Sequence, residues 1–102
     1  MSEVRAASLA EVVPGHPMLV VLGGTRVVLS RVGAEVYALG DTCAHPGGPL
    51  GEGKLSGIRL ACPWHGWMYD VRTGACLFPG RGAAVPSYPA RVEAGAVWVE
   101  VP

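Results

Sequence analysis

Glycine and proline interrupt this chain of 102 residues at short intervals, and these frequent turn-forming residues limit its fold more than any other feature. The 15 glycines and 9 prolines separate short runs rich in Val, Leu, Ile and aromatic residues. No run is long enough and periodic enough to predict a helix. Many short apolar runs between turn signals are typical of all-β domains, so we expect an antiparallel β-sandwich or a partly open barrel.

The expected strands follow from the apolar runs and the turns between them. Residues 18–22 and 25–31 should pair across a two-residue Gly-Gly turn, which is a hairpin signal. In 96–101, the alternation of valines with other residues indicates a strand with one buried face. Ser8 and Glu11 have the spacing of a capping box, which predicts one helical turn. The remaining predicted strands cover residues 4–7, 35–39, 58–61, 68–71, 75–78 and 89–93.

Charge and hydropathy argue against several classes of function. Eight Lys and Arg residues balance eight Asp and Glu residues without any basic run, so we expect no binding to nucleic acid or to an anionic membrane. The longest apolar run, 18–22, is too short to cross a bilayer, and the N-terminal residues include no apolar stretch of signal-peptide length. These features predict a soluble, cytoplasmic protein with no room for a separate catalytic domain.

Two short Cys-His pairs are the main candidates for function. Cys43 precedes His45, and Cys62 precedes His65, each pair directly after an expected strand. Both pairs should therefore lie on loops that project from a β scaffold, and each loop offers one thiolate and one imidazole. The three cysteines make an odd number, which without a secretory signal indicates metal or redox chemistry rather than a disulfide framework.

Two kinds of metal site fit four such ligands. A single zinc ion binds two cysteines and two histidines in a tetrahedron, and many small domains use such an ion structurally. The spacing argues against zinc, because one residue separates Cys43 from His45, whereas zinc ligand pairs usually have about two to four between them. A binuclear site removes the difficulty, since each loop can give its cysteine to one iron and its histidine to the other.

The sequence around these residues resembles the motif of a known family. CAHPGGPLGEGKL, which begins at Cys43, and CPWHGWMYDVRTG, which begins at Cys62, are similar to the two halves of the Rieske iron-sulfur motif. The resemblance implies one 2Fe-2S cluster per chain. In that arrangement Cys43 and Cys62 bind one iron, and His45 and His65 bind the other.

Four positions near the motif refine this expectation. Respiratory and photosynthetic members of the family have a disulfide between two further cysteines, where this chain has Gly48 and Trp64. The lack of both cysteines is typical of a protein in a reducing compartment. Those members also have a serine that donates to a bridging sulfide, where this chain has Trp67, whereas Tyr69 keeps a hydroxyl that can donate to a cysteine sulfur. Because hydrogen bonds to cluster sulfur favour the reduced form, we expect a low reduction potential.

The resemblance implies an electron carrier rather than an enzyme. The leading interpretation is a low-potential Rieske-type ferredoxin that passes single electrons from a flavoprotein reductase to a terminal oxygenase. Two alternatives stay open: the small Rieske-like subunit of a nitrite reductase, whose partner is the large subunit, and a structural zinc module. The implied fold is a single domain, 1–102, with a small cluster-binding part of two ligand loops at about 41–71 and a base formed by the remainder. Cys76, in the sequence ACLF, is expected to be an unreactive core residue in a buried strand.

Overall fold

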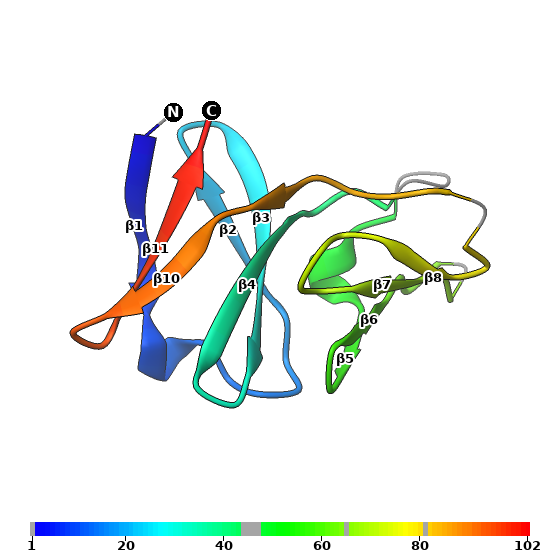
Figure 1. Cartoon of the computed structure of the whole chain (residues 1–102), viewed down its shortest axis with the longest axis horizontal. Helices are drawn as coiled ribbons and strands as arrows, with labels where there is room; N and C mark the ends of the chain where they lie inside the picture. Colours follow the sequence, from blue (N-terminus) through cyan, green and yellow to red (C-terminus); the bar gives the residue numbers. More distant parts are fainter. Residues whose placement is uncertain (1, 44–47, 65, 81) are drawn as a thin grey trace.

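The computed structural model describes residues 2–43, 48–64, 66–80 and 82–102. Within them the strands form three antiparallel sheets (Figure 1). The first sheet, in the order β1-β11-β10, contains β1 (Ser2–Ser8), β10 (Ala90–Glu93) and β11 (Ala96–Val101). The second, in the order β2-β3-β4-β9, contains β2 (Met18–Leu22), β3 (Thr25–Val32), β4 (Glu35–Gly40) and β9 (Ser87–Tyr88). The third, in the order β5-β6-β7-β8, contains β5 (Lys54–Ser56), β6 (Arg59–Ala61), β7 (Met68–Asp70) and β8 (Cys76–Phe78).

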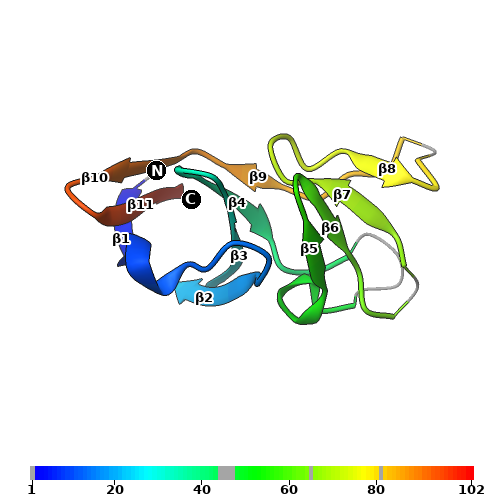
Figure 2. The same cartoon turned by 90° about the horizontal axis from the view of Figure 1, so that it is seen from below.

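The first two sheets curve around a common core and form a partly open barrel, which we call the base (Figure 2). Val97, Val99 and Val101 of β11 are buried in this core, and the residues between them are partly exposed. The predicted alternation of this strand is therefore confirmed. The third sheet, which we call the small sheet, lies beside the base rather than inside it.

Strand β3 separates the two cores of the molecule. Val27 and Leu29 belong to the core of the base, whereas Val28 belongs to a second core that lies between the base and the small sheet. All three side chains are completely buried. A strand covered on both faces needs a continuous apolar run, which explains why this segment does not alternate between apolar and polar residues. The small sheet contributes Leu55, Leu60 and Tyr69 to the second core.

Each of the predicted strands is present, and β2 and β11 have the predicted limits. Two strands, β5 and β9, were not predicted, because runs of three and two residues carry no periodic signal. The predicted turn after Ser8 is the 3-10 turn η1 (Leu9–Glu11), and the Glu11 carboxylate accepts hydrogen bonds from the backbone N–H (2.8 Å) and the hydroxyl (3.0 Å) of Ser8. A second 3-10 turn, η2 (Leu50–Glu52), precedes β5. Among the described residues, no helix has the length and apolar character needed to cross a membrane.

The expected burial of the strand around Cys76 is wrong. Strand β8 pairs with one strand, β7, and is the last strand of the small sheet; on its other side the N–H of Cys76 donates to the carbonyl of Ala83 (3.0 Å). Leu77 and Phe78 are 45% and 59% exposed, and Cys76 itself is only partly buried. Apolar composition predicted a core strand, but a strand at the edge of a sheet gains cover from one neighbour only.

Candidate metal centre

The first cysteine loop connects β4 to η2 and is closed at its base like a narrow hairpin. The backbone N–H of Cys43 donates to the carbonyl of Gly48 (2.8 Å), and Thr42 forms a bridge with Pro49. One step further out, the N–H of Leu50 donates to the carbonyl of residue 41 (2.6 Å). These contacts fix the backbone on both sides of the loop and hold Cys43 at a defined position.

A buried carboxylate supports this closure. Asp41 is 3% exposed, and its Oδ1 accepts a hydrogen bond from the backbone N–H of Gly51 (2.7 Å). Its Oδ2 lies 3.3 Å from Nη2 of Arg26 on β3, so the loop is also tied to the base. Sequence reasoning missed Asp41. No local signal indicates this contact, because its partners are ten and fifteen residues away in the sequence.

The second cysteine loop connects β6 to β7 and is tighter. The N–H of Cys62 donates to the carbonyl of Trp67 (2.7 Å), and the N–H of Gly66 donates to the carbonyl of Cys62 (3.0 Å). Gly66 has a φ of 71°, a left-handed conformation that glycine adopts at little cost. The loop can therefore turn within six residues and place Cys62 next to the small sheet.

Both cysteine side chains point into the second core. Cys43 and Cys62 are each 2% exposed, neither forms a disulfide, and both belong to the core that also contains Leu60 and Tyr69. The Tyr69 hydroxyl lies 3.1 Å from Sγ of Cys43, and Tyr69 is itself completely buried. The contact between Tyr69 and a cysteine sulfur, which the resemblance implied, is thus present. A thiolate ligand carries no proton, so in the metal-bound state the tyrosine is the donor.

The two loops meet at Gly48. A Cβ atom added to Gly48 would lie 2.7 Å from Sγ of Cys62 and 3.1 Å from the ring of Trp64, closer than side chains normally approach. Glycine is therefore required here for steric reasons. Gly48 and Trp64, which stand where the resemblance places the family's disulfide cysteines, therefore lie close to each other across the two loops. Trp64 is 58% exposed, whereas Trp67 is partly buried against the second core.

The turn after β7 holds a second carboxylate that the sequence analysis did not single out. Arg72 donates to both oxygens of Asp70, from Nε to Oδ1 (3.0 Å) and from Nη2 to Oδ2 (2.9 Å). This hydrogen bonding keeps the pKa of Asp70 below its usual value and outweighs the opposing effect of burial. The pair fixes the end of the strand that carries Tyr69.

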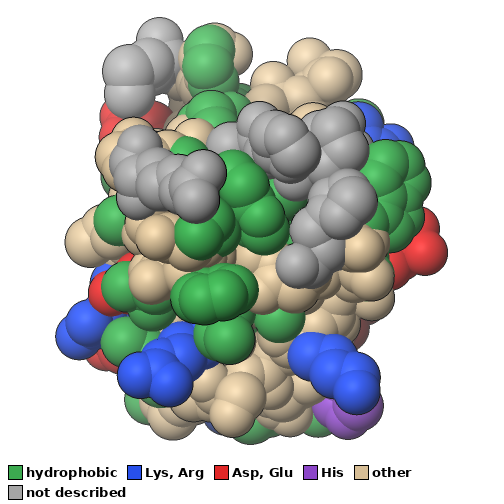
Figure 3. Space-filling model, turned by 90° about the vertical axis from the view of Figure 1, so that its right-hand side faces the viewer, with side chains coloured by type: hydrophobic (Ala, Val, Ile, Leu, Met, Phe, Trp, Pro, Cys, Tyr) green, Lys and Arg blue, Asp and Glu red, His purple; other side chains and the backbone are tan. Residues whose placement is uncertain are grey.

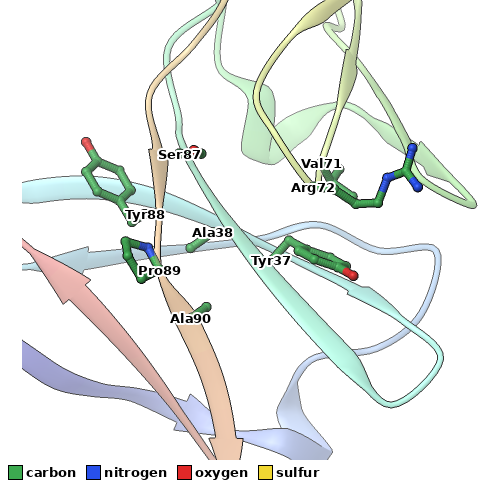
Figure 4. Close-up of a pocket in the computed structure, with 8 residues that line it drawn as sticks. All are labelled: Tyr37, Ala38, Val71, Arg72, Ser87, Tyr88, Pro89 and Ala90. Carbon is green, nitrogen blue, oxygen red and sulfur yellow. The ribbon is translucent and has the colours of Figure 1, made fainter.

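A pocket of about 280 Å³ lies near this turn, away from the cysteines (Figure 4). Tyr37, Val71 and Arg72 line one part of it, and Ser87 and Tyr88 line another. The Arg72 guanidinium is already occupied by Asp70, and none of the predicted site residues lines the pocket. The pocket is therefore no candidate for the metal centre, and the two cysteine loops stay the predicted site.

His45 and His65 lie outside the described residues, so their assignment as ligands stays a prediction. The residues that are described fit an iron-sulfur cluster, because two buried, unbridged thiols and a hydroxyl donor face one core. A model of the Rieske [2Fe-2S] domain matches residues 2–89.

The chain belongs to the Rieske [2Fe-2S] domain family. Membership implies one 2Fe-2S cluster per chain and removes the alternative of a structural zinc module.

Two Rieske relatives differ in how much of their length this chain represents. It is 29% identical over 90 residues to the ferredoxin component of the naphthalene 1,2-dioxygenase system of Pseudomonas putida. That alignment covers 88% of this chain and 86% of the ferredoxin component. This chain is also 36% identical over 93 residues to methylxanthine N1-demethylase NdmA of the same organism. That alignment covers 83% of this chain but only 26% of the demethylase. The Rieske chain thus spans about a quarter of the demethylase and most of the ferredoxin.

Two solved Rieske structures are similar over nearly the whole chain. The ferredoxin of carbazole 1,9a-dioxygenase from Nocardioides aromaticivorans IC177 has a TM-score of 0.89 at 30% identity and covers 97% of both chains. A protein from Mycobacterium tuberculosis, described as an NADH-dependent nitrite reductase small subunit, has a TM-score of 0.88 at 27% identity and covers 99% of this chain and 96% of that one.

Proposed function

We propose that this protein is a one-electron carrier that passes electrons from a flavoprotein reductase to a terminal oxygenase. The observation that supports this role best is the match in both fold and length to the ferredoxin of carbazole 1,9a-dioxygenase. A relative of the same extent is the ferredoxin component of a naphthalene dioxygenase system.

Four residues are proposed to hold the cluster. Cys43 and Cys62 bind one iron, and His45 and His65 bind the other. When bound, such a cluster accepts and releases a single electron. The cluster-binding part covers about residues 41–71 of a single domain.

The surroundings of the cysteines are proposed to set the reduction potential. Tyr69 donates to Cys43, burial of both thiols keeps water from the sulfur, and Trp67 replaces the serine that donates to a sulfide in other members. With one donor kept and one lost, the potential lies toward the bottom of the roughly −150 to +300 mV range of Rieske centres. Voltammetry that gives a value above about +200 mV contradicts this proposal.

A cytoplasmic location fits the residues at positions 48 and 64, neither of which is a cysteine. These positions hold a disulfide in other members of the family, and here a glycine and an indole ring occupy the space instead. A protein of a reducing compartment gains nothing from a disulfide that the glutathione pool opens.

Electron paramagnetic resonance of the dithionite-reduced protein tests the cluster and its ligands. The mean g-value should be that of a histidine-ligated cluster rather than an all-cysteine one. His45→Ala and His65→Ala should abolish or convert the signal. His16→Ala is the matched control, because His16 lies outside the motif and should leave the signal unchanged. A colourless, silent sample contradicts the proposal.

A second candidate, the small subunit of a nitrite reductase, is favoured by the similarity to the mycobacterial structure. Reconstitution distinguishes the two roles. NADH-driven product formation by a naphthalene dioxygenase lacking its own ferredoxin should depend on added protein if the leading proposal holds. Nitrite reduction that depends on added protein, with no support of the oxygenase, favours the second role.

A further inference from the structure

A groove of about 330 Å³ runs beside the second cysteine loop. Its lining comes from residues 52–54 at the start of β5, from 61–63 at the end of β6, and from Gly66. Cys62 is among these residues, so the groove reaches one of the proposed iron ligands. We call it the Lys54 groove, because the side chain with the longest reach at its rim is that of Lys54.

The pairing of the small sheet places Lys54 on its outward face. Lys54 lies opposite Ala61, Ala61 lies opposite Met68, and Met68 lies opposite Phe78. Directly opposed residues share a face of an antiparallel sheet. The neighbouring row, which contains Leu60 and Tyr69, faces the second core instead. The outward row therefore leads from a positive charge at one edge of the sheet to an exposed aromatic ring at the other.

Apolar side chains are exposed at the same end of the molecule. Trp64 is 58% exposed, and Leu77 and Phe78 on β8 are 45% and 59% exposed. Figure 3 shows hydrophobic side chains gathered on the face at this end, with Lys and Arg side chains flanking them below. Exposed apolar groups bordered by charges are typical of surfaces that contact another protein.

The charges at this end are mainly positive or neutralised. Lys54 is the only lysine of the chain, and neither it nor the exposed Arg59 forms an ion pair with a described residue. Asp70 is neutralised by Arg72, which leaves Glu52 as the exposed carboxylate of the described residues between 41 and 80. The other exposed carboxylates belong to the base: Glu3, Glu11, Glu35 and Glu93.

We propose that redox partners contact this protein across the Lys54 groove, and that their contact surface is apolar with carboxylates at its rim. This inference rests on the proposed function. A carboxylate of the partner pairs with Lys54 while apolar side chains pack on Trp64 and Phe78. This contact would place the redox cofactor of the partner beside Cys62, one of the residues proposed to hold the cluster, so that a reduced partner could give one electron to the oxidised cluster or an oxidised partner could take one from the reduced cluster. Glu52, which also lines the groove, opposes this attraction.

Stopped-flow oxidation of the reduced protein tests the local charge. Two one-electron oxidants of opposite charge are compared. Ferricyanide is an anion and is reduced to ferrocyanide, whereas tris(phenanthroline)cobalt(III) is a cation and is reduced to the cobalt(II) complex. Lys54→Glu should slow the reaction with ferricyanide by roughly three- to tenfold at an ionic strength of about 0.1 M and speed up the reaction with the cobalt complex. Glu52→Lys should have the opposite effect on both.

Arg5→Glu is the matched control, because it changes the net charge by the same amount at the other end of a molecule 37 Å long. A charge that far away is screened, since the Debye length is about 10 Å at this ionic strength. Equal effects of Lys54→Glu and Arg5→Glu overturn the proposal. If the unmodified protein shows no cluster signal at all, the proposed function on which this inference rests is overturned instead.

Carbodiimide cross-linking gives a readout that needs no electron transfer. The oxidised protein is mixed with flavodoxin, an acidic flavoprotein, and the reagent joins carboxylates to amines that touch them. The expected product is an amide bond through Lys54, identified by mass spectrometry, and Lys54→Arg should remove it. Cross-links through the N-terminal amine alone show that an acidic partner binds elsewhere and overturn the proposal.

Discussion

Replacement of Tyr69 by Phe isolates the effect of one hydrogen bond on the reduction potential. The variant removes the hydroxyl that lies 3.1 Å from Sγ of Cys43 and keeps the ring that fills the second core. Reduction adds negative charge that is partly shared by the thiolate, so this donor stabilises the reduced form more than the oxidised form. The variant should therefore have a lower potential than the unmodified protein.

The size of the shift follows from the difference between two kinds of hydrogen bond. A bond to a neutral acceptor contributes about 0.5–1.5 kcal/mol and a bond to a charged one about 1.5–3 kcal/mol. Reduction should therefore strengthen the Tyr69 bond by about 1 kcal/mol. For a one-electron couple, about 1.4 kcal/mol corresponds to 59 mV, so the expected fall is about 40 mV.

Protein-film voltammetry measures this shift directly, and visible absorption shows that the cluster is intact. Tyr88→Phe is the matched control, since Tyr88 packs against the core of the base, whereas both cysteines belong to the second core. It should leave the potential unchanged. An intact Tyr69→Phe protein whose potential stays within about 10 mV of the original refutes the argument that this bond distinguishes the two oxidation states.

Three further variants test the support of the cysteine loops. Gly48→Ala should reduce the cluster content per chain and lower the melting temperature, because the added Cβ would lie 2.7 Å from Sγ of Cys62. A normal iron content would show that the two loops can move apart to make room, and it would contradict this prediction. Asp41→Asn should lower the free energy of unfolding by roughly 1–3 kcal/mol in urea titrations, since its buried carboxylate accepts two partly buried hydrogen bonds. No loss of stability contradicts this. Arg72→Gln should raise the pKa of Asp70 toward its usual value. The stabilisation from Asp70 is present above the unfolded pKa of about 3.9 and lost as the pH falls through the lower folded pKa, so the variant should lose stability at a higher pH in acid titrations; identical profiles contradict this.

The base of the fold could be predicted largely from local pattern. Strands β2 and β3 are contiguous apolar runs on either side of a Gly-Gly turn, and a hairpin is the only pairing that such a short connection allows. Strand β11 alternates because one of its faces is buried. In both cases residues close in sequence decide the structure, so a reading of the sequence is enough.

The short elements around the site depend on partners far away in the chain. Strand β9 has two residues and exists because Ser87 and Tyr88 pair with β4. Strand β5 follows η2 and pairs with β6 over three residues. Their sequences alone show no preference, since two or three residues carry too little periodicity to indicate a strand. The exposure of β8 was missed for the same reason, because composition does not reveal which strand is at an edge.

The sequence by itself determined the chemistry of this protein. The spacing of the two Cys-His pairs argues against a single zinc ion, and the resemblance of the surrounding residues to the Rieske motif implies a 2Fe-2S cluster. Only the tertiary structure decided the environment of the cluster. Tyr69 reaches a sulfur 26 positions away, and Gly48 makes room for Cys62 and Trp64 on another loop. These contacts form when the small sheet packs on the base, and they bring together side chains that no pattern along the chain connects.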